Sequence, residues 1–174
     1  MHERYRSIAR VEKTHGKRGE VVTVAAHGLP LVLDVGMEVF PVPPALKGPR
    51  SYRVNSCDDG PTGQLVSFSG VETIDAASAL VGKELLVREE ALPASFALHD
   101  VERLVGREVS DQTLGTFGSI DEVLQGAAND VWVVHGPYGE VLVPVVDVFV
   151  LSVRNGGPIE VALPAGLVDV EGQR

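Results

Sequence analysis

The stretch that says most about the fold is THGKRGE, residues 14–20, in which two glycines flank a pair of cations between two strand-like runs. Glycine adopts positive φ without strain, so the stretch predicts a tight hairpin turn that projects Lys17 and Arg18 outward. Such a tip can meet RNA phosphate or an acidic protein surface. The alternative is an ordinary turn whose charges only aid solubility. The candidate contact residues are His15, Gly16, Lys17, Arg18 and Gly19.

Outward from this turn, alternation of apolar and polar residues predicts short strands through the first half of the chain. The longest alternation is residues 31–39, where every second residue is apolar and Asp34 and Glu38 fall on the opposite face. Further strands are expected at 19–25, 52–55 and 65–69. The last two are separated by a turn at 58–61, which is rich in Asp, Gly and Pro.

One segment, residues 73–82, predicts a helix. Thr73 or Asp75 can cap its start, and Gly82 can end it in a left-handed conformation. A helix this short is not stable alone, so it should dock on the barrel of its own domain. The face expected to be buried consists of Ile74, Ala77, Leu80 and Val81.

A break at residues 89–95 combines a charge pair, a proline and small residues. Beyond it, short strands with glycine-rich turns predict a second small barrel. We therefore expect an all-β fold of two small β-barrels with one short helix. The expected domains are residues 1–90 and 100–174, joined by a linker at 91–99. The strands expected in the second domain are 104–109, 115–124, 131–134, 141–151 and 159–163, with Trp132 in the core.

Charge is distributed unevenly along the 174 residues, whose net charge is −9. Six of the fifteen basic residues lie in the first eighteen positions, whereas residues 91–174 hold twelve acidic and four basic residues. An acidic second half is a poor match for broad binding to a phosphate backbone and a better match for a basic protein partner. The alternative is that these acids only keep a small domain soluble.

The location expected for the chain is the cytoplasm. The N-terminal residues lack the apolar core of a signal peptide, and the longest apolar stretch, residues 141–153, is too short and interrupted to span a bilayer. The only cysteine, Cys57, rules out an intramolecular disulfide and fits a reducing compartment.

Catalytic and metal-binding motifs are weak. The five histidines lack the spacing of a helical or finger-type metal site, and Cys57 has no second cysteine as companion. A P-loop is excluded, because Val11 stands at its first glycine and Arg18 at its Ser or Thr. Cys57 with a distant His, or a serine with His99 and Asp100, could be imagined as a hydrolase, but no nucleophile lies in a recognisable elbow. We expect no enzyme activity, no metal and no cofactor.

Several of these segments follow one another as they do in the RimM family of ribosome maturation factors, which the chain resembles over nearly its whole length. The 15–21 turn is similar to the family's N-terminal signature, and Leu92-Pro93 to its interdomain linker. Other matching segments are 70–73, 76–82, 104–106, 114–115, 126–131, 143–144 and 164–167.

The resemblance implies a six-stranded N-terminal barrel like those of translation factors and a C-terminal PRC-type barrel. It also implies a non-catalytic assembly factor that binds the immature small (30S) ribosomal subunit near its head, through a ribosomal protein, and supports 16S rRNA processing. Many members carry an aromatic pair implicated in ribosome binding where this chain has His99 and Asp100, with Phe96 as the nearby aromatic. Phe96, His99 and Asp100 are therefore added to the expected partner-binding residues.

Two other classes remain open. A PRC-barrel scaffold or small-molecule-binding protein unrelated to ribosomes would be associated with a membrane or a larger complex. A hydrolase would depend on His99. The partners that we expect are a small-subunit head protein and the immature subunit with its 16S rRNA, bound by a monomer away from membranes.

Overall fold

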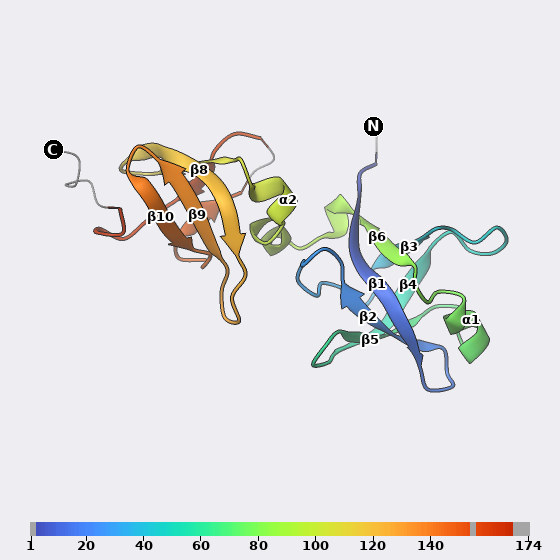
Figure 1. The fold of residues 1–174 in the computed structure, drawn as a ribbon. Helices are drawn as coiled ribbons and strands as arrows, with labels where there is room; N and C mark the ends of the chain where they lie inside the picture. The colour runs from blue at the N-terminus through green and yellow to red at the C-terminus, as the bar shows by residue number, and fades with distance from the viewer. Residues whose placement is uncertain (1–2, 154–155, 169–174) are drawn as a thin grey trace. The chain divides into compact units, whose positions relative to one another are not determined.

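The computed structural model describes residues 3–153 and 156–168, so the last residues of the predicted second domain lie outside the described part. The chain divides into two compact units, Met1–Phe96 and Ala97–Arg174, coloured blue to green and green to red in Figure 1. This division falls inside residues 91–99. The domain limits given above, 1–90 and 100–174, stay a prediction.

The first unit is a closed six-stranded barrel with strand order β1-β2-β5-β4-β3-β6. Neighbouring strands in this barrel are antiparallel throughout. Closure leaves no strand with unpaired edges, which suits strands rich in valine. The strands are β1 (Tyr5–His15), β2 (Glu20–Ala25), β3 (Glu38–Val42), β4 (Tyr52–Asp59), β5 (Gln64–Phe68) and β6 (Glu84–Arg88).

The core of this barrel is mainly aliphatic, with Phe68 and Phe96 as its buried aromatic residues. Alternate residues of each strand point inward, and β-branched side chains pack well on a pleated surface. The fully or almost fully buried side chains include Ile8, Val11, Val21, Val39, Val54, Val66, Leu85 and Val87. Together with the strand order, this core confirms the all-β class.

The strand predicted at 31–39 is wrong over most of its length, because β3 begins only at Glu38. The chain turns before it, with Gly36 at φ 88°. The Gln64 side chain replaces a strand partner, accepting a hydrogen bond from the Leu33 N–H at 3.3 Å and donating to the Leu33 carbonyl at 3.1 Å. Leu33 is therefore buried while Val35 is 59% exposed.

The predicted helix is shorter than 73–82: α1 spans Ile74–Ser78. Thr73 caps it by accepting a hydrogen bond from the Ala76 N–H at 3.2 Å. Ala77 and Leu80 are buried as expected. Burial was also predicted for Ile74 and Val81, and this prediction is wrong, since these residues are 46% and 41% exposed. The helix ends before a full apolar stripe can form.

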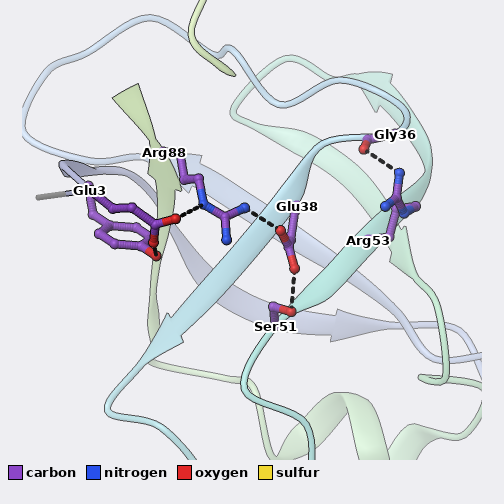
Figure 2. A network of polar contacts seen from close by, with 7 residues as sticks. Glu3, Gly36, Glu38, Ser51, Arg53 and Arg88 are labelled. Carbon is purple, nitrogen blue, oxygen red and sulfur yellow. Dashed lines mark hydrogen bonds and ion pairs between the residues drawn. The ribbon is translucent and has the colours of Figure 1, made fainter. Parts of the chain in front are cut away.

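A polar network lies on the outside of the same barrel (Figure 2). Arg88 reaches Glu38 at 2.5 Å and Glu3 at 3.5 Å, and Ser51 donates to Glu38 at 2.7 Å. Hydrogen bonds from Ser51 and then from Arg88 lower the pKa of the Glu38 carboxyl. All these side chains are partly exposed to water, so the network links β3, β4 and β6 but adds little to the free energy of unfolding.

The second unit is a six-stranded sheet of order β10-β9-β8-β7-β12-β11, in which β12 and β7 are parallel. Its core surrounds the fully buried Trp132 and Phe117, so the core position predicted for Trp132 is confirmed. The strands are β7 (Glu108–Asp111), β8 (Gly115–Leu124), β9 (Val131–Gly136), β10 (Gly139–Pro144), β11 (Val150–Ser152) and β12 (Ile159–Val161).

Two strand predictions in this unit need correction. A second short helix, α2 (Val101–Leu104), stands where a strand was expected to begin, and Leu104 is fully buried. Gly106 at φ 84° then turns the chain into β7. The strand expected at 141–151 is divided, because β10 ends at Pro144, which lacks the N–H that a ladder needs.

Candidate partner-binding surface

The tip of the β1–β2 hairpin presents the predicted cations to solvent. His15 pairs with Glu20 across the ladder, and the turn between them has Gly16 at φ 64° and Gly19 at φ 85°. Lys17 and Arg18 are both exposed. Among residues 3–153 and 156–168, neither cation takes part in a hydrogen bond or ion pair, so both are available to a partner.

Gly19 differs from the exposed residues beside it because it is buried against another segment of the chain. A Cβ at this position would lie 2.2 Å from the Val71 carbonyl oxygen and 3.0 Å from the Glu72 nitrogen. Only glycine allows this approach. The backbone of the tip is thereby packed on the turn that precedes α1. The contact of Gly19 with Val71 brings together the segments 15–21 and 70–73, which are separate motifs in the sequence.

The segment between the two sheets is not an extended linker. It forms two 3₁₀ turns, η1 (Glu89–Ala91) and η2 (Ala94–Leu98). Phe96 is only 5% exposed and packs in the core of the first unit, while Leu98 packs against the core of the second. The Phe96 ring is thus part of the first core in this structure, and its expected contact with a partner stays a prediction.

His99 and Asp100 are also held within the second unit. His99 Nδ1 lies 2.6 Å from Asp130 Oδ2, and the other oxygen of Asp130 accepts a hydrogen bond from the Gly126 N–H at 3.4 Å. Asp100 is almost fully buried, with Arg103 Nε 3.6 Å from its carboxylate. The sequence did not reveal the His99–Asp130 pair, because the two residues are 31 positions apart. In this pair His99 ties the start of the unit to the turn before β9.

The imagined hydrolase finds little support in this geometry. In the described part of the chain, the hydrogen-bond partner of His99 is Asp130, and His99 has no hydrogen bond to a hydroxyl or thiol. Burial, followed by the nearby Asp59, Asp34 and Asp58 carboxylates, raises the pKa of the Cys57 thiol to about 11. The thiol is therefore protonated at neutral pH and a poor nucleophile.

The acids in the middle of the second unit are not interrupted by Lys or Arg. Residues 108–153 contain seven Asp and Glu residues and neither Lys nor Arg. On the outer face, His135 of β9 lies between Asp121 at 3.0 Å and Glu140 at 3.6 Å. All three side chains are exposed. This face offers carboxylates to a cationic partner.

A pocket of about 280 Å³ lies beside Asp111, between the β7–β8 turn and residues 163–168. The Asp111 carboxylate accepts backbone hydrogen bonds from Thr113 at 2.8 Å, Leu114 at 3.1 Å and Leu163 at 2.9 Å. Burial opposes its ionisation, but these bonds outweigh burial and lower the pKa of Asp111. Because both carboxylate oxygens already accept these backbone hydrogen bonds, Asp111 stabilises the β7–β8 turn. The walls of the pocket are mainly apolar.

Asp111→Asn is expected to destabilise the second domain by about 1–3 kcal/mol at pH 7, because an amide NH₂ must face backbone N–H donors. A lowered folded-state pKa adds stability above the unfolded pKa and loses it as pH falls through the folded value. The difference between wild type and variant should therefore shrink below about pH 4. Urea unfolding followed by Trp132 fluorescence measures it. A difference that stays constant from pH 7 to pH 3 would contradict this role.

No group of three or more His, Cys, Asp and Glu residues in the described ranges could hold a metal ion. None of the described helices is both long and apolar enough to cross a membrane.

Comparison with known proteins covers both units. The model of the RimM N-terminal domain matches residues 7–92, and that of the RimM PRC barrel domain matches residues 101–167. The ribosome maturation factor RimM of Thermosipho melanesiensis is 31% identical over 163 residues, which is 92% of each chain. That of Lactiplantibacillus plantarum is 28% identical over 175 residues, covering 95% of this chain and 99% of the relative.

Among solved structures, a RimM protein from Pseudomonas aeruginosa aligns with a TM-score of 0.44 at 23% identity, covering 93% of this chain and 99% of that one. The family assignment rests on the sequence matches, which span both domains and, for a relative 31% identical, nearly the full length. The chain belongs to the RimM family.

Proposed function

We propose that this chain is a cytoplasmic ribosome maturation factor that binds the immature small (30S) ribosomal subunit and supports 16S rRNA processing. It acts as a monomer and by binding, without a catalytic step. Its site of action is near the head of the subunit, where a basic ribosomal protein is its direct partner. Relatives named as ribosome maturation factors support the general role.

The observation that carries the proposal is the β1–β2 tip. Lys17 and Arg18 are exposed on a turn whose backbone is packed against Val71, at a position where only glycine fits. A turn that served solubility alone would not need this packing. Cations on a fixed backbone lose little freedom when they meet phosphate or carboxylate groups.

The second unit supplies the complementary half. The acids of residues 108–153, which include no Lys or Arg, repel RNA and attract a basic protein, which fits a ribosomal protein as partner. Phe96 and Asp100 are buried, so we assign the contact to the tip and the acidic face and give His99 a supporting role. Exposed charge pairs contribute only about 1 kcal/mol each, so simultaneous binding by both domains must supply the rest of the affinity.

Reversing both charges, Lys17→Glu with Arg18→Glu, should weaken co-sedimentation with immature small subunits about tenfold. The exposed position means that the melting temperature should stay within a few degrees of wild type. The matched control is the exchange Lys17→Arg with Arg18→Lys, which keeps the charges and should bind within about threefold of wild type. Unchanged co-sedimentation of the charge-reversed variant would remove the tip from the interface.

A further inference from the structure

The connection between β3 and β4 is an exposed loop whose charges are all positive. From Val39 to Cys57 the sequence holds Lys47, Arg50 and Arg53 and no Asp or Glu. Lys47 and Arg50 are exposed, and in the described part of the chain neither forms a hydrogen bond or ion pair. Leu46, directly before Lys47, has a completely exposed side chain, at 102% of its reference area.

This loop leaves the barrel at the same end as the β1–β2 tip. Both β1 and β3 pair antiparallel with β6, so they run in the same direction. The chain leaves β1 at His15 and β3 at Val42, and in Figure 1 the tip, α1 and the teal β3–β4 loop lie around one end of the barrel. The loop thus adds two cations to the end that already carries Lys17 and Arg18.

Composition also limits how the loop can move. Prolines at 43, 44 and 49 fix φ at three of the eight positions from 43 to 50 and remove their N–H donors. A chain restricted in this way loses less entropy when it binds. The loop that carries Leu46, Lys47 and Arg50 therefore has few alternative backbone conformations.

The chemistry fits RNA better than a protein. Lys and Arg bind phosphate oxygens, and an exposed aliphatic side chain beside them can pack against an unstacked base or ribose. At protein interfaces the energetic anchors are mainly Trp, Tyr and Arg, and Leu is under-represented among them. An acidic protein would use the two cations but leave Leu46 without a role.

We propose that the β3–β4 loop is a second RNA contact, in which Lys47 and Arg50 bind phosphates and Leu46 packs on a base or ribose. The choice of 16S rRNA as its ligand rests on the proposed function. The contact itself is separate from the Lys17–Arg18 tip. Its contribution divides into an electrostatic part, which depends on salt, and an apolar part, which does not.

The test measures binding of the full chain to protein-free 16S rRNA transcribed in vitro, at several salt concentrations. Lys47→Glu with Arg50→Glu should lower affinity about tenfold and reduce the slope of log affinity against log salt by about 1.5, the loss of two phosphate contacts. Leu46→Ala should lower affinity about fivefold with an unchanged slope. The matched control for Arg50→Glu alone is Arg4→Glu, which makes the same charge change at the opposite end of the barrel. Its affinity for the transcript should stay within about twofold of wild type.

The proposal is overturned if Lys47→Glu with Arg50→Glu binds like wild type, if Arg4→Glu loses as much as Arg50→Glu, or if the wild-type chain does not bind the transcript. Binding to poly-L-glutamate that is lost in the loop variant while RNA binding is kept would assign the loop to an acidic protein instead. Because this assay uses naked RNA, its failure is distinct from a failure of the proposed function, which is read on immature particles.

Discussion

Replacing Gly19 with alanine is expected to lower the free energy of unfolding of the first domain by about 2–5 kcal/mol. Two costs combine. An L-residue at φ 85° is strained, by about 1–2 kcal/mol. The new Cβ would also lie 2.2 Å from the Val71 carbonyl oxygen, and relieving such overpacking costs about 1–3 kcal/mol. The tip and the turn before α1 must then separate, so binding to immature subunits should fall as well.

The matched control is Gly16→Ala in the same turn. Gly16 has φ 64°, but a Cβ there would meet only the Glu20 carboxylate, at 3.6 Å. Alanine at position 16 has the backbone strain but not the clash, so the free energy of unfolding should fall by only about 1–2 kcal/mol. Far-UV circular dichroism in urea follows the strands of both domains, while the fluorescence of the single tryptophan, Trp132, reports on the second alone, so a circular dichroism transition without a fluorescence change belongs to the first domain. Equal losses in the two variants would show that the approach to Val71 contributes nothing.

Replacing Trp132 with alanine is expected to destabilise the second domain by about 3–5 kcal/mol, through lost burial and the cavity that remains. Trp132 is fully buried in the same core as Val109, Val143 and Ile159. Loss of this domain removes the acidic face, so subunit binding should fall with it. Urea unfolding followed by circular dichroism measures the effect, since the fluorescent probe is removed.

Trp132→Phe serves as the control for this second change. The indole N–H of Trp132 is buried and has no hydrogen-bond partner in the described part of the chain, so phenylalanine removes an unpaired donor along with some volume. The cost should be below about 1.5 kcal/mol. If Trp132→Phe were as damaging as Trp132→Ala, an unseen polar interaction of the indole would have to be present.

Local signals in the sequence predicted the parts of the structure that depend on neighbours along the chain. The glycines around Lys17 and Arg18 require a turn, and Thr73 caps α1 through a bond three residues away. The alternation at residues 31–39 was misleading because a distant side chain, Gln64, binds the backbone of Leu33 in place of a neighbouring strand. Alternation alone cannot show which residues have a strand beside them.

The candidate site was only partly predictable, for the same reason. Exposure of Lys17 and Arg18 follows from the turn, but the packing of Gly19 on Val71 joins segments 52 positions apart. The sequence places Phe96 in a break between domains and does not indicate that its ring belongs to the first core. The pairing of His99 with Asp130, rather than a role beside Asp100, likewise appears only once the second unit is folded.

The most direct measurement of the central claim is a pull-down of small ribosomal subunits from cell extract with the tagged full chain. The amount of precursor and mature 16S rRNA that is recovered gives the ratio of immature to mature particles. We expect several-fold enrichment of immature subunits over their share in the extract, and less enrichment when Lys17 and Arg18 are both replaced by glutamate. Recovery of the two kinds of particle in the extract's own proportion, or of neither, would contradict it.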